Sequence, residues 1–250
     1  MSKAVIDLGF GDSGKGITTD YLCSITQNPL VIRFSGGQQA GHTVSNKFGK
    51  HTFSNFGSGT LRGVPTFWSN HCTMDPVGIM NECHTLLKEN NIIPKMFISP
   101  GCPVTTPYDK LFNRSILSYM DHGTCGVGVG QTWDREENHY HLRYGDLFSN
   151  RILNIKLDMI REYYLKGRPF TYSASELDSM LEAFIDACEK AFSENKDEFS
   201  IGGMTFSVDS FIYRNYKKKN TYIRNWPEIM TIDGWFEKSE KNKDLLMEEY

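Results

Sequence analysis

The chain has 250 residues, a net charge of −3 at pH 7 and 39% hydrophobic residues. This length is sufficient for one globular domain with a sizeable core. The nearly balanced charge argues against nucleic acid as a partner, and no stretch is long and apolar enough to span a membrane. The start of the chain lacks the long apolar segment of a signal peptide, so we expect a cytoplasmic protein.

The cysteines support the same compartment. The chain has six of them, all far apart in sequence, and none forms a Cys-x-x-Cys pair. This spacing is typical neither of a zinc site nor of a disulfide framework. We therefore expect reduced thiols.

The first half of the chain alternates short apolar runs with helical patterns, and glycines end the runs. Strands are expected at Ala4–Leu8, Pro29–Phe34 and Lys95–Ser99, and helices at Ile17–Ser24, Asp75–Asn90 and Tyr108–Met120. The glycine-rich stretch Gly123–Gly130 is expected to be a loop, followed by the exposed polar residues Asp134, Glu136 and Glu137. This alternation predicts an α/β fold with a central, mostly parallel sheet flanked by helices.

The second half of the chain is expected to be largely helical. Arg151–Lys166 and Ser175–Phe192 have amphipathic helical patterns, and the charged tail Glu237–Tyr250 is interpreted as a frayed helix. We thus predict a nucleotide-binding α/β core over residues 1–148. Residues 149–250 would form a reduced helical and irregular C-terminal part that packs on this core, giving a single compact domain.

A glycine loop follows the first predicted strand. Gly9–Gly16 nearly fits the phosphate-binding pattern Gly-x-x-x-x-Gly-Lys-Ser/Thr. Its backbone N–H groups and the N-terminus of the next helix would face phosphate, and Lys15 would neutralise the outer phosphates. Gly16 replaces the hydroxyl residue that usually holds magnesium. Asp12 is therefore the predicted metal ligand, because magnesium prefers hard oxygen ligands.

A second glycine loop, Gly36–Thr43, follows the second predicted strand. If the two strands are parallel neighbours, this loop lies beside the first one at the edge where α/β sheets bind ligands. His42 would then contact phosphate and stabilise the negative charge that develops during phosphoryl transfer.

Together the two loops resemble those of the adenylosuccinate synthetase family, which carries Gly-Asp-Glu-Gly-Lys-Gly and Gly-Gly-His-Asn-Ala-Gly-His-Thr at this separation. The resemblance covers roughly the first three-fifths of the chain. It continues through the segments Phe56–Gly59, Ser99–Pro103, Gly123–Gly130 and Arg143–Leu147. It implies a P-loop-like nucleotide-binding domain.

The resemblance implies an NTP-dependent ligase of purine biosynthesis that joins IMP, or a related monophosphate such as dGMP, to L-aspartate. Its cofactors would be Mg²⁺ and GTP or ATP as the phosphate donor. Asp12 would remove the proton from purine N1 and bind the metal, His42 would act on the phosphate side, and the Gly41 carbonyl would be the second metal ligand. The implied nucleotide-binding residues are Gly11, Ser13, Gly14, Lys15, Gly16, Gln39, Ala40, Thr43, Thr124, Cys125 and His139.

Several positions differ from the family pattern. Ser13 replaces Glu, Gln38 and Gln39 replace His and Asn, and Val127 stands where the family has an arginine. His139 falls where a dimer partner's phosphate-binding arginine is expected, and the family's dimer makes a homodimer the default. The family's Gly-Thr-Thr-Thr-Gly-Arg aspartate loop and its Thr-Lys-x-Asp guanine segment are not found in the sequence.

The missing aspartate loop keeps two alternatives open. The chain could be a phosphohydrolase or phosphotransferase, or a non-catalytic nucleotide-binding subunit that needs a partner protein. The identity of the acceptor nucleotide also stays open. Asp12 favours a purine base without a substituent at position 2, such as hypoxanthine, while some viral relatives use guanine.

Overall fold

The computed structural model describes residues 3–9, 11–39, 41–117, 125–166, 172–192, 198–201, 204–207 and 246–249. None of the helices in these ranges combines the length and apolar character that a membrane span requires. The cysteines are free thiols, of which Cys125 is exposed and the other five are buried.

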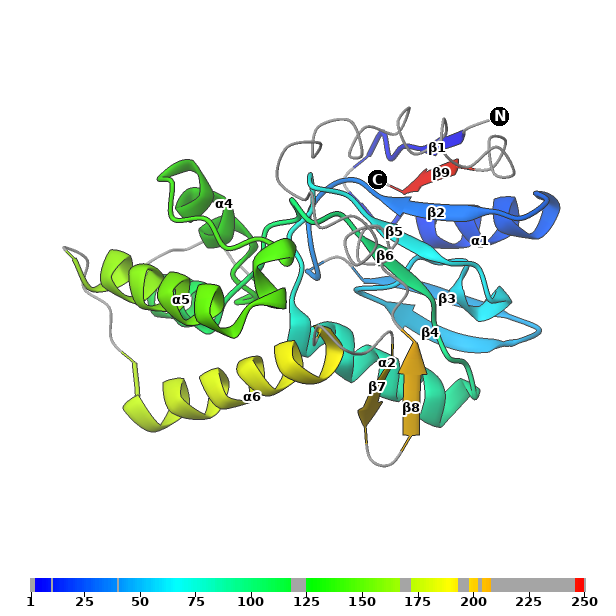
Figure 1. The fold of residues 1–250 in the computed structure, drawn as a ribbon. Helices are drawn as coiled ribbons and strands as arrows, with labels where there is room; N and C mark the ends of the chain where they lie inside the picture. Colours follow the sequence, from blue (N-terminus) through cyan, green and yellow to red (C-terminus); the bar gives the residue numbers. More distant parts are fainter. Residues whose placement is uncertain are drawn as a thin grey trace, which may run out of the picture.

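A five-stranded parallel sheet lies on one side of the molecule in Figure 1, across from α4, α5 and α6, and its strand order is β1-β9-β2-β5-β6. The predicted fold class, a parallel sheet flanked by helices, is confirmed. The sheet strands are β1 (Lys3–Val5), β2 (Leu30–Arg33), β5 (Thr66–Trp68), β6 (Met96–Ile98) and β9 (Leu246–Glu249). The helices are α1 (Lys15–Ile25), α2 (Pro76–Asn90), α3 (Pro107–Leu117), α4 (Val129–Glu137), α5 (Asn150–Leu165) and α6 (Ala174–Phe192).

Two antiparallel hairpins and two short 3₁₀ helices complete the described elements. One hairpin pairs β3 (His42–Asn46) with β4 (Gly49–Phe53), and the other pairs β7 (Glu198–Ile201) with β8 (Met204–Ser207). The 3₁₀ helices are η1 (Thr60–Arg62) and η2 (Tyr144–Phe148). The first hairpin was not predicted, since its strands carry few apolar side chains and only Val44, His51 and Phe53 are buried.

The expectation that β1 and β2 are neighbours is wrong. Strand β9 lies between them and pairs in parallel with both, opposing Leu30 with Leu246 and Lys3 with Met247. The assignment of the whole tail as a helix is also wrong, because residues 246–249 are extended. This strand could not be predicted from its composition, because two of its four residues are glutamates and a buried parallel strand is usually apolar.

The polar loop expected around Asp134, Glu136 and Glu137 is in fact helix α4. Glu136 is buried and Asp134 half-buried, whereas Glu137 is exposed as expected. Glu136 accepts hydrogen bonds from the Leu142 N–H at 3.1 Å and from the Arg143 Nε at 3.2 Å. Helix α4 therefore buries the Glu136 carboxylate, which the sequence predicts to be exposed. Hydrogen bonds from the segment after the helix compensate for the loss of water.

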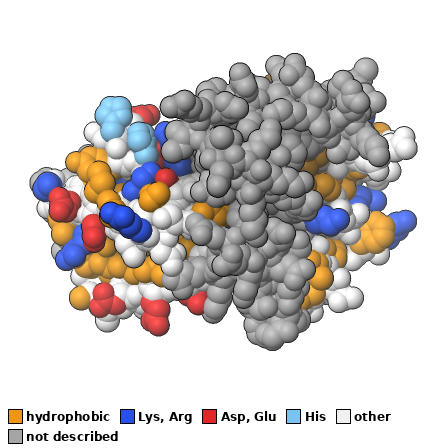
Figure 2. Space-filling view, in the orientation of Figure 1, with side chains coloured by type: hydrophobic (Ala, Val, Ile, Leu, Met, Phe, Trp, Pro, Cys, Tyr) orange, Lys and Arg blue, Asp and Glu red, His pale blue; other side chains and the backbone are white. Residues whose placement is uncertain are grey.

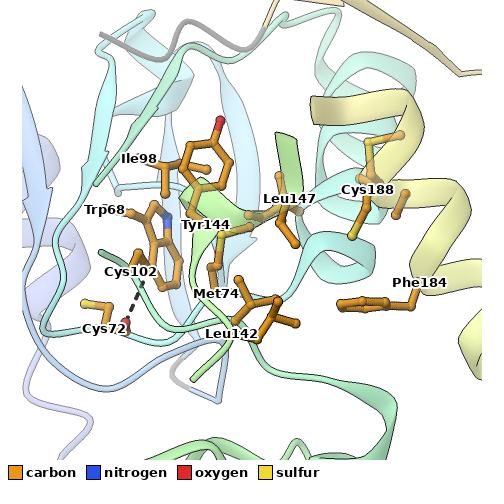
Figure 3. Packing of buried hydrophobic residues seen from close by; sticks show 14 of the residues in the cluster. Trp68, Cys72, Met74, Ile98, Cys102, Leu142, Tyr144, Leu147, Phe184 and Cys188 are labelled. Atoms are coloured by element: carbon orange, nitrogen blue, oxygen red, sulfur yellow. Dashed lines mark hydrogen bonds between the residues drawn. The ribbon is translucent and has the colours of Figure 1, made fainter. Parts of the chain in front are cut away.

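The largest hydrophobic cluster joins the sheet to the helical half of the chain. Trp68 and Ile98 from the sheet pack in one cluster with Tyr144 and Leu147 of η2 and with Phe184 of α6 (Figure 3). Within it the Cys102 thiol donates to the Cys72 carbonyl at 3.3 Å. Packing of this kind, and not local propensity, fixes the positions of the short strands.

On the face shown in Figure 2, side chains of both charge signs are mixed among hydrophobic ones over the described helical part. The large apolar side chains of α5 that are exposed are Ile152, Ile155, Met159 and Leu165.

Candidate functional site

The first glycine loop connects β1 to α1 and is built on left-handed backbone. Gly11, Asp12 and Gly14 have φ values of 99°, 53° and 77°. Gly14 is the N-cap of α1, and Asp12 and Ser13 are exposed. The loop therefore presents the open N-terminus of α1, and the side chain of Asp12, to solvent.

Asp7, at the start of this loop, is the centre of its hydrogen bonding. Its Oδ1 accepts from the Gly9 N–H at 2.7 Å and from the Ser13 hydroxyl at 2.9 Å, while its Oδ2 accepts from Lys15 Nζ at 2.7 Å. The hydrogen bond from Lys15, followed by those from Gly9 and Ser13, lowers the pKa of Asp7 to about 2. Any stability that this network adds is present above the ordinary pKa of 3.8 and is lost as the pH falls through 2.

The two glycine loops meet at Gly16. A Cβ atom at this position would lie 2.9 Å from the Cβ of His42 and 3.2 Å from the Ser58 hydroxyl. Helix α1 packs against β3, the strand that begins at His42. The structure thus brings His42 beside the first loop although β9 separates β1 from β2. A Ser or Thr side chain at position 16 would therefore displace His42.

Replacing Gly16 by alanine is expected to lower the free energy of unfolding by about 1–3 kcal/mol, the usual cost of overpacking. Urea unfolding followed by circular dichroism measures this change. The matched control is Gly130→Ala in helix α4, where no atom lies within 4 Å of the added Cβ. That substitution should be neutral or stabilising by up to about 1 kcal/mol. Equal stability of both variants would contradict the close approach of His42 to Gly16.

The second loop leaves β2 at Arg33, a buried cation. Arg33 donates from Nη2 to the Gly37 carbonyl at 3.4 Å and from Nη1 to the Ser54 carbonyl. Its guanidinium also lies 4.9 Å from the centre of the Trp68 ring, a cation–π contact. The base of the second loop is therefore anchored to the sheet and to the segment after β4.

Two predicted binding residues of the second loop lie at its surface. Gln39 is exposed, and its amide approaches Gly36, whose φ is 76°. Thr43 is exposed too, and its hydroxyl lies 2.9 Å from that of Thr52 across the hairpin. Ala40 and Thr124 lie outside the described residues.

The glycine-rich segment before α4 joins the second loop. Gln38 Nε2 donates to the Val127 carbonyl at 3.2 Å, and a Cβ on Gly37 would lie 2.9 Å from Val129. Cys125 is exposed at the described end of this segment. Three glycine-rich segments that are distant in sequence therefore form one contiguous region: the first loop meets the second, and the second meets the third.

His139 is separated from this region. It lies beyond the last residue of α4, a helix whose nine residues extend about 13 Å. It is exposed, has a φ of 68°, and its ring centre is 5.9 Å from that of His141. Within one copy of the chain, α4 thus holds His139 away from the segment that contains Cys125.

The predicted magnesium ligands are one carboxylate, Asp12, and one carbonyl, Gly41. Among the described residues there is no group of three or more His, Cys, Asp or Glu that could hold a metal without further ligands. Magnesium in phosphate-handling proteins is usually bound by one or two carboxylates together with substrate phosphates and water. This donor set fits a magnesium ion that arrives with a triphosphate.

Sequence reasoning missed Asp7 and Arg33. Both lie where a strand runs into a glycine loop, and both place a charge inside or next to otherwise apolar residues. The available signal was a charged residue near the end of each predicted buried strand. The partner of Asp7 is Lys15, and Arg33 donates to the Gly37 carbonyl. Both contacts depend on how the chain folds back after the strand.

Comparison with known proteins shows the family of the chain. The family model of adenylosuccinate synthetase matches residues 4–206. The chain is 31% identical over 185 residues to adenylosuccinate synthetase of Histophilus somni, which covers 71% of this chain and 42% of that protein. It is 30% identical over 206 residues to the enzyme of Acidithiobacillus ferrooxidans, covering 76% and 46%.

The fold is also similar to a solved structure, that of fully ligated adenylosuccinate synthetase from Plasmodium falciparum. The TM-score is 0.66 at 16% sequence identity, and the match covers 98% of this chain and 50% of that one. The chain spans less than half the length of the curated relatives that it matches.

Proposed function

Because this chain belongs to the adenylosuccinate synthetase family, we propose that it uses a nucleoside triphosphate to activate a purine monophosphate for attack by L-aspartate. The observation that carries the proposal is the contact of Gly16 with His42. This contact supports the proposal because His42 of the second loop lies beside the phosphate-binding pattern of the first, so that both loops would act on the same phosphates.

The proposed chemistry has two steps. The purine O6 attacks the γ-phosphorus while Asp12 takes the proton from N1, and the nucleoside diphosphate leaves. The amino nitrogen of aspartate then attacks C6, and phosphate departs to leave a succino-nucleotide. Asp12 suits this role because it is exposed at the mouth of the loop, and a general base must reach the proton that it removes.

The other loop residues position and neutralise the phosphates. The N–H groups of Gly11, Ser13, Gly14 and Gly16 would surround phosphate oxygens, as at other helix N-termini. Lys15 would bind the outer phosphates, and His42 would stabilise the charge that develops on the transferred group. Asp12 and the Gly41 carbonyl would hold Mg²⁺, which supplies further charge neutralisation when bound. The donor is GTP or ATP.

The acceptor would lie over the second and third glycine-rich segments. We assign its contacts to Gln39, Ala40, Thr43, Thr124 and Cys125. The exposed His139 would reach the acceptor phosphate of a second copy, because α4 separates it from the site in its own copy. The homodimer is therefore part of the proposal.

The test is direct. The purified chain is incubated with IMP or dGMP, L-aspartate, Mg²⁺ and GTP or ATP, and the products are separated by mass spectrometry. We expect a succino-nucleotide, with one phosphate released for each molecule formed. Omission of aspartate is the control and should abolish sustained phosphate release. No product with any combination, or phosphate release that does not depend on aspartate, would contradict the proposal.

A further inference from the structure

The carboxylate of Asp7 accepts hydrogen bonds from groups that, in a phosphate-binding loop, normally donate to the phosphate ligand. They are the Gly9 N–H, the Ser13 hydroxyl and the Lys15 ammonium, at 2.7, 2.9 and 2.7 Å. The Asp7 and Lys15 side chains are only 11% and 16% exposed. The ion pair is therefore shielded from water more than an ordinary surface pair.

Lys15 cannot serve Asp7 and a phosphate equally well. In the pattern Gly-x-x-x-x-Gly-Lys, the lysine reaches the outer phosphates of the nucleotide. In this structure its nitrogen is in contact with Oδ2 of Asp7 instead. A bound triphosphate must either draw Lys15 away from Asp7 or share it with a second anion, and both cost free energy.

We propose that Asp7 is an internal competitor of phosphate at the first glycine loop, and that it determines how strongly this loop binds phosphate ligands. The inference rests on the proposed function, because it takes the loop as the triphosphate site. It adds a residue that the site prediction did not contain.

The charges of the loop lead to the same conclusion. The formal charges of Asp7, Asp12 and Lys15 sum to −1, whereas those of Asp12 and Lys15 alone sum to zero. The low pKa of Asp7, about 2, keeps this carboxylate charged at neutral pH. A ligand that binds only when Lys15 is released has its apparent affinity reduced by the fraction of molecules in which Lys15 is free.

The first measurement is the affinity of the Asp7→Asn variant for phosphate ligands. Asparagine keeps an oxygen that accepts from Gly9 and Ser13, so the loop conformation is preserved while the charge is lost. Calorimetric titration with MgGTP, MgATP and inorganic tripolyphosphate should show roughly fivefold tighter binding of the preferred ligand than in the parent chain, the size expected for a weak ion pair plus relief of repulsion.

The matched control is Glu162→Gln on α5. It also removes one negative charge from an ion pair with lysine, that of Glu162 with Lys166 at 2.9 Å, and it leaves the loop intact. Its affinity for the same ligands should equal that of the parent chain. If Glu162→Gln tightens binding as much as Asp7→Asn, the effect is one of net charge and the inference is overturned.

A second measurement does not need a nucleotide. The rate at which acetic anhydride modifies Lys15 is followed by peptide mass spectrometry, with the exposed Lys166 as the internal reference. We expect Lys15 to react several-fold faster in Asp7→Asn than in the parent chain, because its nitrogen is no longer held by the carboxylate. Equal rates would overturn the inference whatever the nucleotide affinities are.

The two measurements separate the inference from the function on which it rests. If the parent chain and all variants bind none of the phosphate ligands, the proposed function is rejected. The role of Asp7 as a competitor of phosphate is then rejected too, even if Lys15 reacts faster in Asp7→Asn. If the parent chain binds MgGTP or MgATP and Asp7→Asn binds no more tightly, the proposed function stands and only the role of Asp7 is rejected.

Discussion

Replacing Asp12 by asparagine is expected to lower kcat/KM for succino-nucleotide formation by about 10²–10⁴-fold, the range typical for the loss of a general base. Asparagine has the same size and accepts left-handed backbone as readily as aspartate, so the φ of 53° at this position is tolerated. It can neither take the N1 proton nor offer a charged oxygen to a metal. The initial rate, measured with saturating donor and aspartate, gives the comparison.

Two controls show whether such a loss is chemical. The melting temperature of Asp12→Asn should match that of the parent chain, because the side chain is exposed. Asp158→Asn removes another exposed carboxylate, on α5, and should retain full activity. Activity of Asp12→Asn within a factor of about three of the parent chain would rule out Asp12 as the base.

Replacing Arg135 by methionine is expected to lower the free energy of unfolding by about 3–5 kcal/mol, the cost of breaking a fully buried ion pair. Arg135 and Asp109 both have 0% side-chain exposure, and Nε of Arg135 lies 2.9 Å from Oδ1 of Asp109. Tyr164 donates its hydroxyl to the same carboxylate at 2.7 Å. Burial, and then the charge of Asp109, raise the pKa of Tyr164, so it stays protonated and keeps this bond. Without Arg135 the carboxylate stays buried and loses its cation.

Urea denaturation measures this loss, and two further variants show its cause. Lys166→Met removes a cation from the exposed pair with Glu162 and should cost less than about 1 kcal/mol. The double variant Arg135→Met with Asp109→Asn removes both buried charges and should be more stable than Arg135→Met alone. If the single and double variants are equally unstable, lost packing and not an uncompensated charge is the cause.

The first glycine loop shows how far local sequence reaches. Glycines before a lysine, between an apolar run and a helical pattern, were sufficient to predict strand, loop and helix, and Gly11 and Gly14 have the positive φ values that such a loop requires. Position 16 shows the limit. Its glycine lacks the hydroxyl that usually holds magnesium, and only the structure shows that a Cβ atom there would lie 2.9 Å from the Cβ of His42.

Strand β5 and helix α4 escaped prediction for a related reason. Both are short, and a run of three or nine residues has too little periodicity to be distinguished from a loop. In α4, the charged residues Arg135 and Glu136 also made the segment look like a polar loop. Asp109 compensates for the burial of Arg135, and the Leu142 N–H and Arg143 compensate for that of Glu136. These partners lie outside the helix, so its own sequence does not reveal them.

The sequence by itself determined the family of the chain, the alternation of strands and helices, and the residue types of the two glycine loops, because these features depend on neighbours a few positions apart. Only the tertiary structure decided that β9 enters the sheet between β1 and β2, that His42 lies against Gly16, and that Asp7 holds Lys15. These contacts join segments whose pairing depends on the packing of the whole sheet and hairpin. Local propensity does not specify such pairings, since each gains its stability only after the rest of the core has formed.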